Sequence, residues 1–412
     1  MFKKNNFEIV NNPNSAEMII INTCGFIESA KKEAIDTIFE MAEYKKQKCK
    51  YLIVIGCLVE RYKEDLEKLI PEVDLFVSIK EYDELWKKIK KLIGEEESNT
   101  CKLDFMERVI TTGDSYAYLK IAEGCSNNCT YCAIPYIQGK YISRKKEDIL
   151  DEAKKLAKKG IKELIVIAQD TTKYGIDIYG RPALAELLEE LCKIDGFEWI
   201  RFLYAYPETI TDELIETVKR NDKICNYFDM PIQHISNKVL KRMNRKSDKD
   251  SIEKVISKIR KEIPDVILRT TLIVGFPGET GEDFNELYNF VKETKFDKLG
   301  AFMYSKEDGT PAAKLKEQIH YMTKKSRYNK IMTLQKGISN QNLEKKKEKI
   351  YKTVIENISF DKKFYIGRTY MDVPEEDGVV FIKKEKDIPI GKFVNVKIKE
   401  VRDYDLVGVI EE

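Results

Sequence analysis

Short apolar runs alternate with longer amphipathic stretches over the first 95 residues of the chain. Alternation of this kind is typical of a parallel sheet covered by helices. We therefore predict an α/β domain over residues 1–95, followed by a polar linker, GEEESNTCK. The expected strands are MIIINTC (18–24), YLIVIGC (51–57) and VDLFVS (73–78), and the expected helices run from 28 to 44, from 60 onward and from 81 to 92.

The same alternation returns between residue 110 and about residue 320. Six strand–helix units in one domain indicate an open or partial β/α barrel, which we assign to residues 110–340. In such barrels the chemistry gathers at the C-terminal ends of the strands. The expected strands are AYLKIAEG (117–124), ELIVIAQD (163–170), WIRFLYAYP (199–207), YFDMPIQH (227–234), ILRTTLIVGF (267–276) and KLGAFMYS (298–305).

Residues 322–349 form a charged helical stretch, and after it the sequence pattern changes to short predicted β-strands separated by turns. Their spacing predicts a small antiparallel β-barrel of about five strands over residues 344–412. The run KKKEK near the end of the helix has two readings, a phosphate contact or a solvated helix face, and we favour the solvated face.

Composition narrows the class of protein. Hydrophobic residues make up 42% of the chain, and 72 Lys and Arg nearly balance 70 Asp and Glu. No apolar run approaches the roughly 20 residues of a membrane span, and residues 1–14 lack the apolar core of a signal peptide. We expect a cytoplasmic α/β protein, so its nine cysteines predict metal binding or catalysis and not a disulfide framework.

Three of these cysteines lie within eight residues, in KIAEGCSNNCTYCAIP, directly after the first strand of the barrel-like domain. Cys125, Cys129 and Cys132 can bind a cubic 4Fe–4S cluster and leave one iron open. An open iron can chelate the amino and carboxylate groups of S-adenosylmethionine. A structural zinc ion would need a fourth ligand, for which only the distant Cys101 is at hand.

The text around the loop resembles one family. The spacing C-x3-C-x2-C is similar to that of the radical S-adenosylmethionine enzymes. Together with IVIAQDTTKYG, MPIQHIS, LRTTLIVGFPGET and LGAFMYSKEDGTPA, it resembles the methylthiotransferases of the RimO type nearly end to end. The resemblance implies an N-terminal methylthiotransferase domain, a radical domain and a C-terminal TRAM domain. It also implies reductive cleavage of S-adenosylmethionine, fed by a flavodoxin- or ferredoxin-type donor, and methylthiolation of the β-carbon of an aspartate on ribosomal protein S-twelve.

Cys24 and Cys57 stand just after two strands of the N-terminal sheet, at the edge where open α/β sheets bind ligands. Without further information, these two cysteines are as consistent with side chains packed in the core as with metal ligands. The resemblance implies that they ligate a second 4Fe–4S cluster. The family's third ligand for this cluster precedes Cys24, and no cysteine does so here. We therefore expect an N-terminal domain that lacks its first strand and first cysteine, through an internal start or a truncation, and a second cluster that is incomplete.

Further cofactor contacts are expected at strand ends of the barrel. Gln169 and Asp170 end its second strand and Gln233 its fourth, while Gly275 opens the turn GFPGET. Tyr131 offers a ring on which adenine can pack.

Two histidines, His234 and His320, are expected to be a satisfied core residue or a helix cap and not metal ligands. Gly124 is expected to let the backbone turn sharply beside the cluster.

The charge balance of the C-terminal barrel indicates which kind of substrate the protein binds. From residue 350 to 412 there are 11 Lys and Arg against 13 Asp and Glu. RNA binding relies on cationic excess, so this barrel suits a basic ribosomal protein on the small ribosomal subunit better than transfer RNA. Two alternatives remain open: a MiaB-like transfer-RNA adenosine methylthiotransferase, and a catalytically incomplete Fe–S protein that binds the ribosome. No membrane partner is expected.

Overall fold

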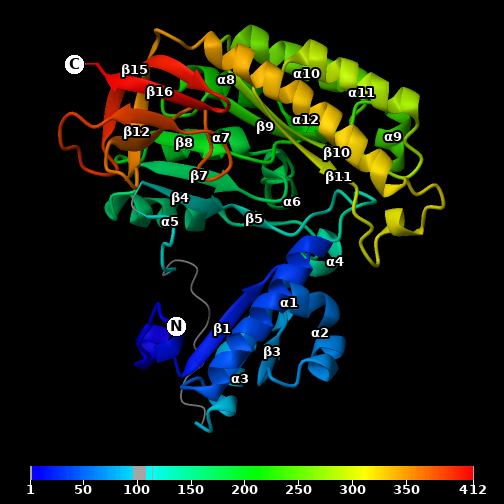
Figure 1. Ribbon diagram of the computed structural model, residues 1–412, viewed down its shortest axis with the longest axis vertical. Helices are drawn as coiled ribbons and strands as arrows, with labels where there is room; N and C mark the ends of the chain where they lie inside the picture. Colours follow the sequence, from blue (N-terminus) through cyan, green and yellow to red (C-terminus); the bar gives the residue numbers. More distant parts are fainter. Residues whose placement is uncertain (1, 96–107, 114, 412) are drawn as a thin grey trace. The chain divides into compact units, whose positions relative to one another are not determined.

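The computed structural model describes residues 2–95, 108–113 and 115–411 (Figure 1). Residues 96–102 of the predicted linker lie outside this part. The chain divides into two units. The first contains residues 1–109, 124–140 and 305–314, and the second contains residues 110–123, 141–304 and 315–412. Among the described residues, no helix is both long and apolar enough to cross a membrane.

The N-terminal strands form a parallel sheet in the order β1-β2-β3. Successive side chains of a strand point to opposite faces, and β2 is apolar on both. Leu52 and Val54 pack under α1 and α2, whereas Ile53 packs against α3 on the other face. The elements are β1 (Met18–Thr23), α1 (Glu28–Ala42), β2 (Tyr51–Gly56), α2 (Cys57–Leu69), β3 (Leu75–Val77), the 3-10 helix η4 (Ile79–Glu84) and α3 (Leu85–Leu92).

The six strands predicted for the central domain are present, in two parallel three-stranded sheets ordered β4-β7-β8 and β9-β10-β11. Ala205 lies just after β8, and its N–H donates to the backbone O of Asp229 in β9 (2.8 Å). This hydrogen bond joins the two sheets. The predicted partial β/α barrel is confirmed. Its strands are β4 (Tyr116–Lys120), β7 (Glu163–Ile167), β8 (Trp199–Phe202), β9 (Tyr227–Gln233), β10 (Ile267–Val274) and β11 (Lys298–Met303), with a short pair β5 (Ala122–Glu123) and β6 (Ile142–Ser143).

Helices cover the central sheets on the outside. Figure 1 shows α10, α11 and α12 alongside β9, β10 and β11, and all of these contribute to one hydrophobic core. The helices of the second unit are α5 (Lys146–Lys158), α6 (Ile176–Tyr179), α7 (Leu184–Cys192), α8 (Asp212–Arg220), α9 (Asn237–Arg242), α10 (Lys249–Glu262), α11 (Gly281–Thr294) and α12 (Tyr321–Glu344).

The C-terminal strands close into a five-stranded barrel ordered β12-β13-β14-β16-β15. The predicted small antiparallel barrel is confirmed, with one exception: β14 and β16 run parallel. A closed ring with an odd number of strands cannot alternate direction at every step, so one parallel pair is unavoidable. The strands are β12 (Ile350–Ile358), β13 (Phe364–Thr369), β14 (Val380–Lys383), β15 (Phe393–Arg402) and β16 (Asp405–Ile410).

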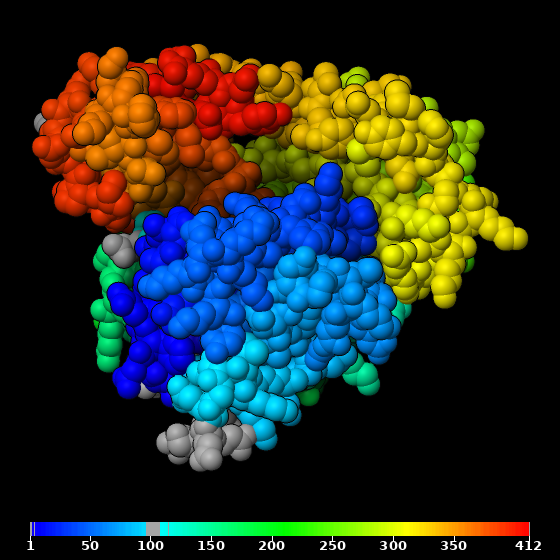
Figure 2. Space-filling view, turned by 60° about the horizontal axis from the view of Figure 1, so that its bottom comes forward, coloured from blue at the N-terminus to red at the C-terminus, as the bar shows by residue number. Residues whose placement is uncertain are grey.

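Buried charges connect this barrel to the central domain. Glu163 is fully buried at the start of β7. Its carboxylate accepts a hydrogen bond from Arg201 Nε (2.9 Å) and pairs with the guanidinium of Arg368 from β13. Burial alone would raise the pKa of Glu163, but the two guanidinium charges lower it. In Figure 2 the orange-to-red surface of the barrel continues into that of α12, where Lys336 pairs with Asp403 at 3.0 Å.

Candidate active site

The three-cysteine loop belongs to the first unit and folds back on itself. Two backbone hydrogen bonds close the loop on either side of α4 (Ile134–Gln138). Before this helix, Cys132 N–H donates to Cys129 O (3.1 Å), and after it Gly139 O accepts from Cys125 N–H (3.1 Å). Cys125 and Cys129 are buried, each 7% exposed. The backbone of the loop therefore gathers the three predicted ligands in one place.

Burial also sets the acidity of these thiols. It raises the pKa of Cys132 to about 12, and the neighbouring Cys129 and Cys125 raise it further. Three thiolates cannot share such a site unless a cationic group balances their charge. Among the described residues, no three His, Cys, Asp or Glu side chains are arranged to hold a single metal ion. Each thiolate of a 4Fe–4S cube binds a different iron, so this donor set fits a cluster better than a lone ion.

Gly124 carries the turn that leads into the loop. Its φ of +71° is unfavourable for residues with a Cβ, and a Cβ there would lie 2.1 Å from Lys140 O. The sharp turn expected at this glycine is confirmed.

Cys24 and Cys57 lie side by side. Strands β1 and β2 pair in parallel up to the partners Thr23 and Gly56, so the next residue of each strand emerges at the same edge. Cys57 is also the first residue of α2. Burial raises the pKa of the Cys57 thiol, and the Cys24 thiol raises it further. A pair of thiols at one strand edge can serve as ligands, and Cys24 is exposed at that edge.

Gln169 and Asp170 follow β7 in the second unit. Asp170 is fully buried, and its carboxylate accepts from Thr172 Oγ1 (2.7 Å) and lies 3.8 Å from Lys173 Nζ. Gln169 is half-buried, and within the described residues its amide has no hydrogen bond. Of the two side chains, Gln169 is the one whose amide is open to a ligand.

Gln233 is the last residue of β9 and Gly275 directly follows β10, and both have positive φ, near 72°. Gln233 Nε2 donates to Pro231 O (3.2 Å). The N–H groups of Gly275 and Phe276 donate to Glu279 Oε2, at 2.5 and 3.1 Å. Sequence reasoning missed Glu279, which is 2% exposed. Burial raises its pKa to about 7, although Arg327 and these amides act in the opposite direction.

The two histidines have structural roles. His320 caps α12 by accepting from Met322 N–H (3.2 Å), so the expected helix cap is confirmed. His234 is fully buried, and its Nδ1 accepts from Ser236 N–H (3.0 Å). Burial lowers the pKa of His234 to about 3, so the ring is neutral.

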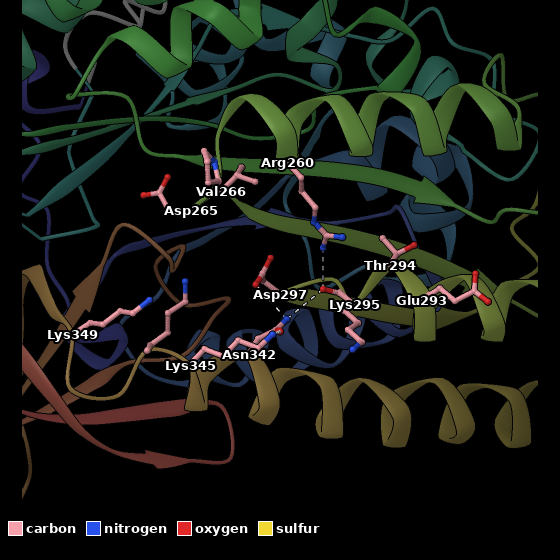
Figure 3. A pocket seen from close by; sticks show the side chains of 12 residues that line it. Arg260, Asp265, Val266, Glu293, Thr294, Lys295, Asp297, Asn342, Lys345 and Lys349 are labelled. Atoms are coloured by element: carbon pink, nitrogen blue, oxygen red, sulfur yellow. Dashed lines mark hydrogen bonds between the residues drawn. The ribbon is translucent and has the colours of Figure 1, made fainter.

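A cavity of about 370 Å³ lies elsewhere in the second unit (Figure 3). Val266 and Asp297, in its wall, immediately precede β10 and β11, so it sits at the N-terminal ends of these strands. The C-terminal ends of α10, α11 and α12 meet here, and Arg260 and Asn342 both donate to Lys295 O. Lys345 and Lys349 of the run KKKEK line this cavity and are exposed, in keeping with the solvated helix face that we favoured.

Comparisons with known proteins agree with this architecture. Family models match residues 1–78 (uncharacterized protein family UPF0004), 119–291 (radical SAM superfamily) and 349–410 (TRAM domain). A ribosomal protein uS12 methylthiotransferase RimO from Alkaliphilus oremlandii is 66% identical over 99% of this chain and 93% of its own length. The chain belongs to the RimO family of methylthiotransferases. A second RimO, from Acetivibrio thermocellus, is 50% identical over 100% of this chain and 93% of its own length.

As a RimO-family protein, the chain is a radical S-adenosylmethionine methylthiotransferase with iron–sulfur and S-adenosylmethionine cofactors, as the sequence motifs predict. The fold is also similar to that of the radical S-adenosylmethionine methyltransferase TsrM from Kitasatospora setae. That structure has a TM-score of 0.56 and 13% identity, over 72% of this chain and 65% of that chain.

Sequence reasoning missed two residues of this RimO-family chain that lie beside the cysteines. Arg61 contacts Glu307 and the loop after Cys24, and Glu307 contacts the first residue of α1. Glu307 lies in SKEDGTPA, one of the segments that carried the resemblance. No periodicity or spacing connects it with Arg61, because 246 positions separate the two in the sequence.

Proposed function

We propose that this chain adds a methylthio group to the β-carbon of an aspartate on ribosomal protein uS12. The observation that carries the proposal is the 66% identity, nearly end to end, to a relative named for that activity. The acidic balance of the C-terminal barrel supports a basic protein substrate, with 13 Asp and Glu against 11 Lys and Arg from residue 350 to 412.

Cys125, Cys129 and Cys132 would hold the cluster that binds S-adenosylmethionine. When bound, this cluster supplies the electron that cleaves the cofactor. The protein's own part is to bury Cys125 and Cys129, which keeps water from the reacting atoms. A flavodoxin- or ferredoxin-type protein would deliver the electron.

Four residues at strand ends of the second unit would orient S-adenosylmethionine, with Tyr131 beside the adenine: Gln169, Asp170, Gln233 and Gly275. The open amide of Gln169 supports this role most directly. The carboxylate of Asp170 and the N–H of Gly275 already have protein partners, so we assign these two to shaping the site.

The test of the substrate compares cells with and without the gene. Mass spectrometry of uS12 is expected to show a gain of one methylthio group only in cells that carry the gene, with the transfer-RNA nucleosides unchanged. An unmodified uS12 in both strains would contradict the protein substrate. A methylthio group that appears on transfer-RNA adenosine would favour the MiaB-like alternative.

We further propose that Cys24 and Cys57 are ligands of a second 4Fe–4S cluster. Their placement after paired positions of β1 and β2 supports this assignment. Anaerobic reconstitution of a longer form that supplies a third ligand is expected to give about eight irons per chain, and about four in a Cys24→Ala/Cys57→Ala variant of that form. Cys49→Ala is the matched control, because Cys49 is buried in the same unit and bonded to Tyr51 O (3.4 Å). Equal iron in all three proteins would contradict the second cluster.

A further inference from the structure

Residues 305–314 connect both cysteine loops of the first unit. Glu307, 2% exposed, is central to this segment. Its Oε1 accepts from Ser305 Oγ (2.7 Å) and from the N–H of Glu28 (3.0 Å), the first residue of α1. Helix α1 has no side-chain cap from its own N-cap residue, Ile27. A distant segment therefore caps the helix that follows Cys24.

Arg61, on α2, joins Glu307 to the loop of Cys24. One guanidinium nitrogen donates to Gly25 O (2.6 Å) and the other to Asp308 O (2.7 Å). The guanidinium lies 3.6 Å from Glu307 Oε2 and stacks 5.0 Å from the ring centre of Tyr62. Because Gly25 directly follows Cys24, Arg61 fixes the backbone that carries that cysteine.

The charge of Glu307 is balanced by two buried cations. Lys31 Nζ lies 3.3 Å from Glu307 Oε2, and the Lys31 and Arg61 side chains are only 10% and 8% exposed. Burial would lower the pKa of Lys31, but Glu28 and Glu307 raise it above its usual value. A buried carboxylate with paired cations holds its geometry only while all partners are present.

The other end of the segment reaches the three-cysteine loop. Ala312 N–H donates to Thr130 O (2.9 Å), between Cys129 and Cys132. Thr310, fully buried, donates its hydroxyl to Glu307 O (2.7 Å) and keeps the segment bent. One stretch of ten residues thus contacts the start of α1 and, through Arg61, the loop of Cys24 at one end, and the loop of Cys129 at the other.

We propose that Arg61 and Glu307 are positioning residues that hold the Cys24 loop against segment 305–314 and so set its place relative to the three-cysteine loop. The proposal rests on the proposed function, in which Cys24 would ligate the second cluster and the three-cysteine loop would hold the cluster that binds S-adenosylmethionine. Small misplacements of reacting groups cost large factors in rate. Loss of this contact therefore uncouples cofactor cleavage from methylthio transfer.

The test uses Arg61→Lys and Glu307→Gln in the full chain. Lysine at position 61 keeps the positive charge but cannot donate to Gly25 O and Asp308 O at the same time. Glutamine at position 307 keeps the size of the side chain but loses the negative charge. Reconstituted variants are expected to keep the iron content and to form 5′-deoxyadenosine within about twofold of the unmodified chain. The ratio of methylthiolated uS12 to 5′-deoxyadenosine is expected to fall at least tenfold.

A second readout needs neither cluster nor substrate. In the cluster-free chain, hydrogen–deuterium exchange at residues 25–31 is expected to accelerate at least fivefold in both variants. Lys63→Gln is the matched control, because Lys63 lies on the same helix and pairs with Glu81 instead (2.7 Å). It is expected to leave exchange at residues 25–31 unchanged.

Variants with wild-type exchange at residues 25–31, or with an unchanged ratio of product to 5′-deoxyadenosine, would overturn the positioning role. Failure of the proposed function gives a different result: the unmodified chain itself would form no methylthiolated uS12, while the exchange readout would still report on Arg61 and Glu307.

Discussion

At the scale of single residues, two glycines frame the three-cysteine loop and differ in one respect. Gly124 and Gly139 have similar positive φ, +71° and +77°. A Cβ on Gly124 would lie 2.1 Å from Lys140 O, whereas nothing lies within 4 Å of a Cβ on Gly139. A side chain at either position would therefore strain the backbone through its positive φ, but only at Gly124 would it also collide with neighbouring backbone.

Gly124→Ala is expected to displace the strand end from the loop and to abolish the brown absorption of the reconstituted cluster. Gly139→Ala is the matched control and carries only the strain of a positive φ, about 1 kcal/mol. The intensity of the brown absorption after reconstitution measures cluster loading in both variants. Equal cluster loading in the two variants would contradict this account of the turn.

Particular residues also show how far sequence reasoning reaches. The thiols of Cys125, Cys129 and Cys132 were found because their ligand spacing is local. The pair Cys24 and Cys57 follows from strand ends, since paired parallel strands bring their carboxyl ends to one edge. Glu307 and Glu279 were not found, because each acts on backbone N–H groups that only the folded chain brings to it.

At the scale of elements, hydrophobic periodicity was sufficient for most strands and helices, because each buries one face or two. It failed where closure of the whole barrel decides the pairing, as in the parallel contact of β14 with β16. It also placed the start of the second helix at residue 60, whereas α2 begins at Cys57. That difference puts a cysteine on the first turn of α2, where burial and the Cys24 thiol raise its pKa.

The start of the 3-10 helix η4 shows how one carboxylate secures an element. Ser78 and Glu81 form a capping box, and Glu81 also pairs with Lys63 and Lys88. Burial alone would raise the pKa of Glu81, but these lysines and the Ser78 N–H lower it to about 2. Because the folded pKa lies below the unfolded one, Glu81 stabilises the fold above about pH 4.5, and this stabilisation is lost as pH falls toward about 2.

Glu81→Gln is therefore expected to lower the unfolding free energy by about 1–2 kcal/mol at pH 7, since a cap and two partly exposed ion pairs are lost. The difference from the unmodified chain is expected to shrink as pH falls below about 4.5. Denaturant titrations of the cluster-free protein at several pH values measure it. Glu84→Gln serves as control, because within the described residues Glu84 forms a single ion pair, with Lys88 at 4.0 Å. A difference that grows toward acid would contradict the assigned pKa direction.

At the scale of the whole molecule, the buried pair of Glu163 and Arg368 connects the C-terminal barrel to the central domain. Arg368 is 1% exposed, and its guanidinium lies 5.8 Å from the ring centres of both Tyr116 and Trp199. A buried ion pair contributes little net stability when it is complete, but removal of one partner leaves an uncompensated charge. Arg368 is thus one buried anchor of the barrel, beside the shared hydrophobic core and the ion pair of Lys298 with Asp372.

Arg368→Met is expected to destabilise the cluster-free chain by about 3–5 kcal/mol, because Glu163 stays buried with one cation fewer. The free energy of unfolding and the rate of proteolytic release of the C-terminal barrel measure the effect. Lys383→Met removes an exposed ion pair, with Glu385 at 3.2 Å, and is expected to cost less than about 1 kcal/mol. Similar losses in both variants would contradict the role of the buried pair.

The central claim is that the thiols of one loop carry the cluster that cleaves S-adenosylmethionine. The most direct measurement is 5′-deoxyadenosine formed by anaerobically reconstituted protein with a reductant and S-adenosylmethionine, for Cys129→Ala and for Cys192→Ala. Cys129 is buried in the loop, whereas Cys192 is half-buried at the end of α7. The account predicts no product above background for Cys129→Ala and normal product for Cys192→Ala. Undiminished 5′-deoxyadenosine from Cys129→Ala would contradict it.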